Sequence, residues 1–203
     1  MSTFLSQPKL LAFSFLLQSL AFSGAAWAEV TIPWPAEKSC VAWQTKKTMF
    51  LFNSVVPIGI NCEIAVKDTV GVAGHQITLT APIERFDSGE ASRDKEVLIL
   101  LKGDVQPVLE FQSKPLEEAK WTTLLNGELK QLDGELKLGG KSYPVTAELT
   151  VSGDKDAKTF EGVIASTFTA FDIKPPKVAG GIVASVEDAL NLRFKILSKD
   201  IQH

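Results

Sequence analysis

The sequence contains few of the residues on which catalysis and metal binding usually depend. It has two histidines and two cysteines in 203 residues, and His75 is the only histidine away from the end of the sequence. The motifs GxSxG, HExxH, GxGxxG and the P-loop are absent. A single histidine before a predicted strand is more typical of a structural or solvent-facing role than of a catalytic triad. The sequence therefore predicts no catalytic residue, no metal site and no cofactor. A hydrolase that uses His75 is the weakest alternative.

Basic charge and long hydrophobic runs are also scarce. The net charge is -3, so the chain has no excess of basic residues that would attract nucleic acid or an anionic membrane surface. One uncharged run, over residues 10–22, follows Lys9, but it is too short for a permanent spanning helix. The small residues Ala26 and Ala28 after it suit a signal-peptidase site. We therefore predict a signal peptide over residues 1–28, cleaved after Ala28, and a soluble periplasmic or secreted protein without stable membrane insertion. An uncleaved anchor is the alternative.

The remaining residues, 29–203, have the length of a single domain with a substantial core. Cys40 and Cys62 are the only cysteines, and an exported chain meets an oxidising compartment. A bridge between them would close a loop of about 22 residues, worth on the order of 3 kcal/mol. Their spacing is not CxxC, so a structural disulfide is favoured over a redox-active pair or a metal site.

Alternation of apolar and polar residues with a period of two dominates this domain. In residues 58–66 the apolar set includes Ile60 and Ile64, which share one face. One segment, residues 90–100, has the N-cap and acidic first turn of a short helix. Many alternating strands with few helices indicate an antiparallel sandwich or a closed barrel. The other predicted strands cover residues 47–53, 76–83, 107–113, 121–130, 159–169 and 190–197.

The stretch QLDGELKLGGKSYPVTAELTV, residues 131–151, changes its hydrophobic phase at Gly139 and Gly140. A two-residue turn at these glycines puts both apolar sets on one face, with Leu136 opposite Tyr143, whereas a three-residue loop would separate them. Pro144 has no N–H to donate to a strand on its other side. The sequence therefore predicts a tight hairpin with a sheet edge or a bulge beside Pro144.

The same stretch, with what precedes it, resembles the YceI-like family. The resemblance implies a lipocalin-like, antiparallel eight-stranded barrel, exported in bacteria, which holds a long isoprenoid lipid in its interior and has no catalytic residues. Glu96 stands near the place of a histidine in the family pattern. The residues that carry the resemblance are Arg93, Asp94, Pro107, Leu109, Phe111, Gly134, Leu136, Gly140, Pro144 and Val145.

Within such a barrel, the inward-facing residues would line a lipid pocket. Phe168 and Phe171 would stand at its mouth or plug an ordinary barrel end, and Arg93 would either pair with a ligand head group or orient the helix with Asp94. A ligand-free envelope protein with a packed core, acting through its surface in a structural or stress-related role, is the leading alternative. The sequence leaves a homodimer open. The predicted lining residues are Ile60, Ile64, Leu79, Phe111, Leu136, Phe160, Phe168, Phe171 and Phe194.

Overall fold

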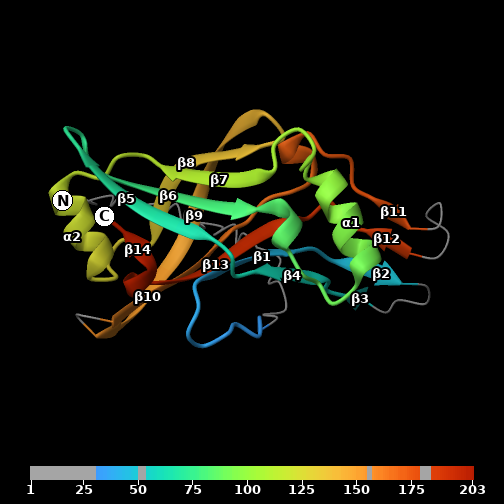
Figure 1. The fold of residues 1–203 in the computed structure, drawn as a ribbon, viewed down its shortest axis with the longest axis horizontal. Helices are drawn as coiled ribbons and strands as arrows, with labels where there is room; N and C mark the ends of the chain where they lie inside the picture. Colours follow the sequence, from blue (N-terminus) through green and yellow to red (C-terminus); the bar gives the residue numbers. More distant parts are fainter. Residues whose placement is uncertain (1–30, 50–53, 155–156, 179–183) are drawn as a thin grey trace, which may run out of the picture. The chain divides into compact units, whose positions relative to one another are not determined.

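The alternating segments form the strands of one curled, ten-stranded sheet (Figure 1). The computed structural model describes residues 31–49, 54–154, 157–178 and 184–203. Neighbouring strands are antiparallel, except for the parallel pair β14 and β5. In hydrogen-bonded order the strands are β14 (Ile201–Gln202), β5 (Ala65–Gly71), β6 (Gly74–Pro82), β7 (Val108–Ser113), β8 (Gln131–Leu138), β9 (Lys141–Asp154), β10 (Ala157–Ile164), β13 (Asn191–Leu197), β1 (Cys40–Gln44) and β4 (Ile58–Asn61).

The predicted eight-stranded, wholly antiparallel barrel is wrong in strand number and in pairing, but the sheet does roll up. β4 and β5 stand near opposite ends of the strand order, yet only residues 62–64 separate them in the chain. Four Cα steps span at most about 15 Å, whereas eight strand spacings of a flat sheet would cover roughly 38 Å. The two sides of the sheet must therefore approach each other. There a single bridge joins Ile60 to Asp87.

The predicted continuous strand over residues 58–66 breaks at Asn61. The Asn61 side chain accepts the Glu63 N–H at 2.7 Å and donates to the carbonyl of Pro82 at 2.9 Å, which bends the chain between β4 and β5. Gly59 pairs with Trp43 of β1, and a Cβ on Gly59 would lie 2.3 Å from the indole nitrogen. Gly59 and Asn61 therefore face inward. The prediction that Ile60 faces the interior is wrong, because it alternates with these two residues.

One of the two helices matches the sequence prediction. The helix predicted over residues 90–100 is α1 (Ala91–Leu100). The strand predicted over residues 121–130 is wrong, because the chain forms α2 (Glu118–Leu125) there. The β-favouring Trp121 and its two following threonines suggested a strand. In the structure Trp121 and Leu124, one helical turn apart, are the buried residues of α2.

The predicted hairpin is confirmed in turn and register. Gly139 and Gly140 have φ angles of 59° and 77°, as a two-residue turn with two left-handed positions requires. Leu136 lies opposite Tyr143, as predicted. The open edge beside Pro144 is also confirmed, because β10 pairs with β9 only from Glu148 onward.

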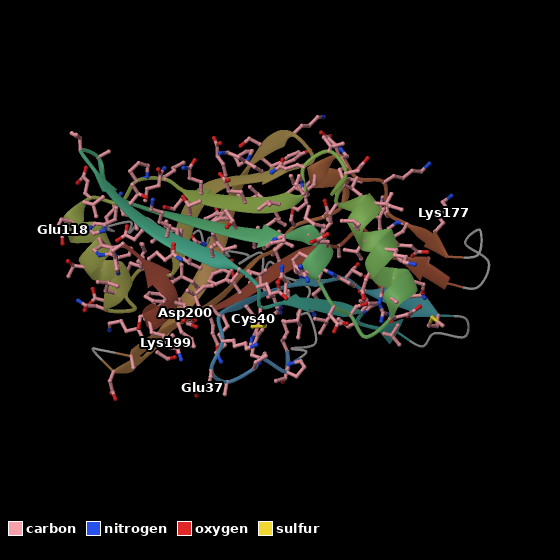
Figure 2. The ribbon with its side chains drawn as sticks, in the orientation of Figure 1. Glu37, Cys40, Glu118, Lys177, Lys199 and Asp200 are labelled. Carbon is pink, nitrogen blue, oxygen red and sulfur yellow. A yellow bond between two sulfur atoms is a disulfide. The ribbon has the colours of Figure 1, made fainter. Side chains whose placement is uncertain are left out.

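A second, four-stranded sheet lies at the α1 end, and α2 lies at the opposite end (Figure 1). Lys177 of the small sheet and Glu118 of α2 mark these two ends in Figure 2. No helix in the described ranges is long and apolar enough to span a membrane. The small sheet has the order β11 (Lys177–Val178), β12 (Ala184–Val186), β2 (Lys47–Met49) and β3 (Ser54–Val55), and the short 3-10 turns are η1 (Ile83–Arg85), η2 (Thr169–Phe171) and η4 (Ser198–Asp200).

The other strand predictions end close to the observed strands. The segments predicted over residues 76–83, 107–113 and 190–197 are β6, β7 and β13. The segment predicted over residues 159–169 is a strand only as far as Ile164, where β10 ends. Of the strand predicted over residues 47–53, β2 covers the first three residues, and residues 50–53 lie outside the described ranges. The signal peptide predicted over residues 1–28 also lies outside them.

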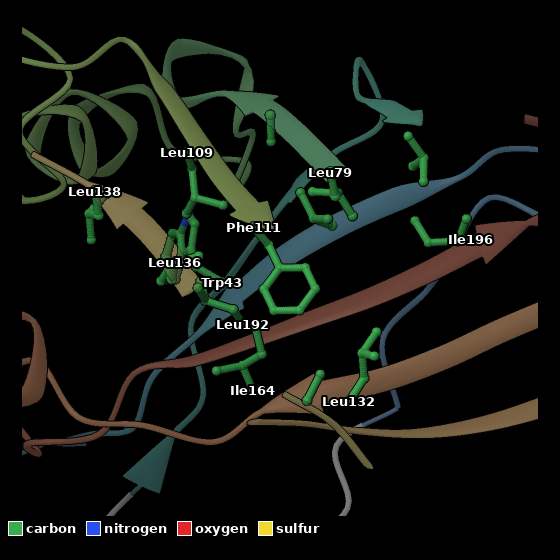
Figure 3. Close-up of a cluster of buried hydrophobic side chains, with 14 of the residues drawn as sticks. Trp43, Leu79, Leu109, Phe111, Leu132, Leu136, Leu138, Ile164, Leu192 and Ile196 are labelled. Carbon is green, nitrogen blue, oxygen red and sulfur yellow. The ribbon is translucent and has the colours of Figure 1, made fainter. Parts of the chain in front are cut away.

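The inward faces of the strands meet in one hydrophobic core. Leu136 is fully buried, and Leu138 is 2% exposed. Figure 3 shows Phe111 in the middle of this cluster, with its ring directed toward the strands that carry Leu192 and Ile164. Both halves of the hairpin therefore face hydrocarbon, as their shared hydrophobic phase indicates.

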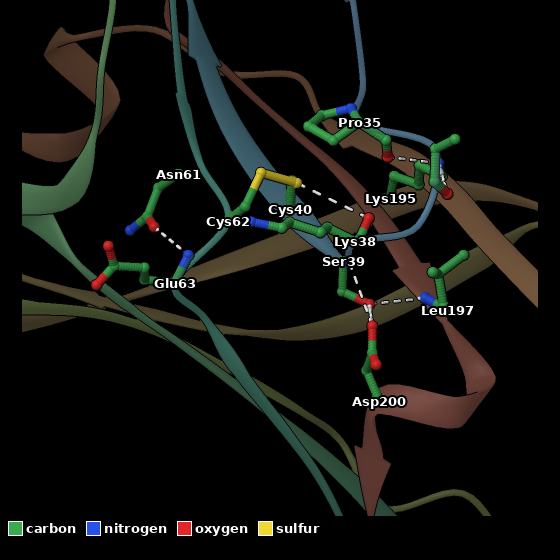
Figure 4. Close-up of a disulfide and its surroundings, with 11 residues drawn as sticks. Pro35, Lys38, Ser39, Cys40, Asn61, Cys62, Glu63, Lys195, Leu197 and Asp200 are labelled. Carbon is green, nitrogen blue, oxygen red and sulfur yellow. Dashed lines mark hydrogen bonds between the residues drawn. A yellow bond between two sulfur atoms is a disulfide. The ribbon is translucent and has the colours of Figure 1, made fainter.

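The predicted disulfide between Cys40 and Cys62 is present and joins β1 to the turn after β4 (Figure 4). Beside it, the Ser39 hydroxyl donates to Oδ2 of Asp200 at 2.6 Å. Lys195 donates to the carbonyls of Pro35 and Ala36 at 3.0 and 2.8 Å. These contacts fasten the start of the described domain across β13 and the C-terminal turn.

Candidate functional site

The curled sheet encloses two small cavities whose walls are almost entirely apolar. One, of about 70 Å³, lies beneath α2 and is named here the α2 cavity. The other, of about 40 Å³, is the central cavity. Leu79, Phe111 and Phe194 line both, so these three side chains divide the interior. Ligand pockets usually have about 300 Å³ or more, so a long ligand requires these side chains to move.

Several predicted lining residues do meet in these cavities. Phe160 lines the α2 cavity, together with Trp121 and Leu124 of the helix. Leu136 lines the central cavity, together with Val41 and Ile164. The strand alternation therefore brings side chains from distant parts of the sequence into one hydrocarbon interior.

A larger cavity, of about 260 Å³, lies between α1 and the small sheet and is named here the α1 cavity. Its apolar part includes Trp43, Phe168 and Leu190, all of them buried. Its remaining walls carry charged groups from α1 and from the small sheet. This cavity therefore combines a hydrocarbon floor with a polar rim, as an amphipathic ligand would require. The charged lining residues are Lys47, Glu90, Arg93, Glu96 and Lys177.

Arg93 lies on the rim and is held by the loop before the helix. Its Nε donates to Oγ of Ser88 at 2.9 Å, and its Nη2 donates to the Ser88 carbonyl at 3.0 Å. Asp94 accepts the Ser88 N–H at 3.0 Å, which fastens the same loop to the first turn of α1. Arg93 also pairs with Glu90 at 3.3 Å. The Arg93–Asp94 pair thus orients the helix, while the Arg93 side chain still borders the α1 cavity.

At the opposite end of the sheet, His75 lies between two carboxylates. Its Nδ1 is 2.8 Å from Oδ2 of Asp68, and its Nε2 is 3.2 Å from Oε2 of Glu118. The His75 ring stacks on Trp121 of α2, with ring centroids 4.4 Å apart. The hydrogen bond to Asp68 raises the pKa of His75, partial burial opposes that rise, and Glu118 adds to it. Because both ring nitrogens are engaged, His75 joins β5, β6 and α2.

Three predicted lining residues line none of these three cavities. Ile60 borders a groove on the outer side of β4, with Ile58 and Pro57. Ile64 packs against the core from the link between β4 and β5. Phe171, which is 2% exposed, packs edge-on against Tyr143 at 5.3 Å.

Apart from Arg93, sequence reasoning missed the contribution of α1. Arg93, Glu96, Val97 and Leu100 all line the α1 cavity. The last three follow Arg93 by three, four and seven residues, which places all four on one face of a helix. The predicted helix therefore already contained this signal. The contributions of Trp43 and Leu190 depend on strand pairing and could not be found in the same way. Within the described residues, no group of three or more histidine, cysteine or acidic side chains is arranged to hold a metal ion.

A curled, largely antiparallel sheet around an apolar interior, with one helix at each end, defines a lipocalin-like fold. A profile of the YceI-like domain matches residues 37–197. The chain therefore belongs to the YceI-like family. A search of curated protein sequences gave no match.

Two solved structures share this fold at low sequence identity. BcnA of Burkholderia cenocepacia is 18% identical, with a TM-score of 0.58, and the match covers 78% of this chain and 96% of BcnA. A polyisoprenoid-binding domain from Saccharophagus degradans is 10% identical, with a TM-score of 0.56, and the match covers 78% of this chain and 95% of that domain. At these identities, the likeness supports the fold alone.

Proposed function

We propose that this chain is an exported binding protein that holds one apolar or amphipathic lipid of the isoprenoid class and carries or shields it between membranes. Membership of the YceI-like family and the fold shared with a polyisoprenoid-binding domain support this proposal. The disulfide and the predicted signal peptide support export.

One row of side chains carries the proposal. Leu190 lines the α1 cavity, Leu192 and Phe194 line the central cavity, and Phe194 and Ile196 line the α2 cavity. These alternate residues, from Leu190 just before β13 to Ile196 within it, therefore line all three cavities in turn. Six residues of extended chain correspond to about 20 Å. Once the side chains between the cavities move, this row would become an apolar path long enough for several isoprene units, with a polar rim at one end.

The lipid would occupy this path after a limited rearrangement of side chains. Phe111, Phe194 and Leu79 divide the interior, and rotation of these side chains would join the central and α2 cavities. Each 100 Å² of apolar lipid surface removed from water contributes about 2.5 kcal/mol. Affinity would therefore come from burial of the chain. The polar end of the lipid would stay at the rim, beside Lys47 and Lys177.

A ligand-free envelope protein that acts through its surface is the second candidate. The two interior cavities together are far smaller than an isoprenoid chain, and Leu136 and Ala81 of the surrounding core are fully buried. A core that never opens would fit this alternative.

Native mass spectrometry of the full chain, expressed with export and purified from the periplasm without detergent, tests the proposal. We expect a co-purified lipid adduct that organic extraction removes. A matched pair on α1 then locates it, because Val97 lines the α1 cavity whereas Ile99 is 73% exposed. Val97→Arg should lower the adduct fraction severalfold, and Ile99→Arg should leave it unchanged.

The same measurement distinguishes the two candidates. An adduct-free wild-type chain that also fails to take up an added polyprenol would favour the packed-core protein. An adduct that both arginine variants retain equally would contradict a site at the α1 cavity. Circular dichroism of each variant checks that the fold is intact.

A further inference from the structure

The wall of the sheet has an opening beside Pro144. Residues 141–147 of β9 are paired only with β8, because β10 meets β9 from Glu148 to Asp154 and no earlier. Pro144 itself has no N–H with which a neighbouring strand could pair. Over about half its length, β9 therefore has an unpaired edge within the sheet.

A short segment, residues 168–173, covers this opening and is named here the wall segment. It contains the η2 turn, and Phe168, Phe171 and Ile173 within it are buried. The Tyr143 hydroxyl donates to the carbonyl of Phe171 at 2.9 Å, and the two rings meet edge to face. Lys141 donates to Oδ2 of Asp172 at 2.7 Å. Side-chain contacts thus take the place of the backbone hydrogen bonds that a neighbouring strand would make to residues 141–147.

The wall segment is held differently along its two sides. Toward β13, the Thr169 N–H and hydroxyl both donate to the Asp188 carboxylate, and these bonds lower the pKa of Asp188. On the same side, the Leu190 N–H donates to the Ser166 carbonyl at 3.0 Å. Toward β9, the ion pair between Lys141 and Asp172 is more than half exposed at both side chains. The β9 side is thus held by side chains alone, through Lys141 and Tyr143, whereas the β13 side also has a backbone hydrogen bond and is suited to act as the hinge.

Two of the cavities lie behind this segment. Phe168, at its start, lines the α1 cavity. Leu136, the cross-strand partner of Tyr143, lines the central cavity, as does Ile164 at the end of β10. The segment therefore stands between the outside and the apolar path.

We propose that residues 168–173 form a side portal, which opens at its β9 edge and lets a hydrocarbon chain pass sideways into the interior. This inference depends on the lipid-binding function proposed above. At the α2 end, Trp121 and Leu124 lie over the α2 cavity, and His75 fastens that helix to the sheet through Glu118. A sideways route also spares a long chain from threading lengthwise past Phe111 and Phe194.

Reversing the charge of Lys141, which pairs with Asp172 at the β9 edge of the wall segment, tests the portal. Lys141→Glu places a carboxylate against Asp172, and the double variant Lys141→Glu with Asp172→Lys restores an opposite-charge pair. Lys137→Glu is the matched control, because Lys137 forms an equally short ion pair with Glu110, 2.8 Å away on β7. Stopped-flow fluorescence would follow N-phenylnaphthylamine, a small apolar probe, as it binds to and leaves the full chain.

A gate changes both rates but not the equilibrium. We expect Lys141→Glu to raise the association and dissociation rate constants together by about threefold or more, with Kd unchanged. The double variant should return toward wild-type rates, and Lys137→Glu should show no effect. Hydrogen exchange of the lipid-free chain gives a second readout, since Lys141→Glu should speed exchange of the Phe171 and Ile173 amides, which bond to the Phe168 carbonyl.

Several outcomes would overturn the portal. Unchanged rates and unchanged exchange in Lys141→Glu would show that the segment does not open at this edge. A faster dissociation with a proportionally weaker Kd would make it part of the binding wall and not a gate. A wild-type chain that takes up no probe and carries no lipid would defeat the proposed function itself, and the portal with it.

Discussion

The two ends of the sheet are stabilised in different ways. At the α2 end, Trp121 and Leu124 are buried in an all-apolar cavity, and His75 fastens the helix to the sheet. At the α1 end, the helix has no buried residue, and its start depends on hydrogen bonds from Ser88 to Asp94. The first end is held by packing. The second is fastened by polar contacts at the edge of a cavity more than three times larger.

This difference suggests a division of labour along the apolar path. Burial of large side chains contributes most to stability, and it favours a single closed arrangement. A helix with half-exposed apolar residues and a charged rim can shift at less cost, which suits an end where a ligand binds. The predictions below test whether stability and binding separate between the two ends in this way.

Trp121→Ala should have the largest effect on stability. It removes a ring that is 8% exposed, lines the α2 cavity and stacks on His75. We expect a loss of about 3–5 kcal/mol in the free energy of unfolding, measured by urea denaturation. Ile99→Ala on α1 is the control, since 73% of that residue is exposed, and it should change stability by less than about 0.5 kcal/mol. Equal losses in the two variants would contradict the comparison.

Ser88→Ala should have an intermediate effect at the other end. The Ser88 hydroxyl donates to Asp94 and accepts from Nε of Arg93, so its removal loosens the start of α1. We expect a loss of about 1 kcal/mol in unfolding free energy, together with weaker lipid retention in native mass spectrometry. Ser92→Ala is the control for stability alone, because the Ser92 hydroxyl bonds to the exposed Glu90 while its side chain also lines the α1 cavity. A stability loss without any change in retention would separate α1 from the binding site.

The parts of the fold that could be predicted are those determined by residues close together in the sequence. The hairpin register followed from the phase of Leu136 and Tyr143 and from two glycines that accept positive φ. α1 followed from its acidic first turn, but the expected serine N-cap, Ser88 or Ser92, is wrong, because the N-cap is Glu90 and its side chain makes no capping hydrogen bond. Two errors had tertiary causes: α2 contains β-favouring residues in a helix that packs over the sheet, and the strand over residues 58–66 was divided by the Asn61 side chain, which bonds across to Pro82.

The candidate site was predictable to a smaller extent. Period-two alternation identified Leu79, Phe111 and Phe194 as inward-facing, and all three divide the interior. Alternation cannot show where the α1 cavity lies, because that depends on how α1 and the small sheet meet. It also placed Ile60 on the wrong face, since the glycine beside it accommodates Trp43.

His75→Gln should have the smallest effect, and that effect should depend on pH. The pKa of His75 is raised above 6.5 in the folded protein by its hydrogen bond to Asp68 and by Glu118. A raised pKa means that the folded state favours the protonated ring, so the stabilisation is fully present below pH 6.5 and is lost as the pH rises through the folded pKa. Wild type should therefore exceed His75→Gln by at most about 1 kcal/mol near pH 5 and by close to nothing near pH 8. Paired urea denaturation curves at the two pH values measure this difference. His203 also approaches Asp68, at 3.5 Å, so His203→Gln is the control and should keep the pH dependence. A pH dependence that persists in His75→Gln would assign it to other groups, and the α2 end would then be held by packing alone.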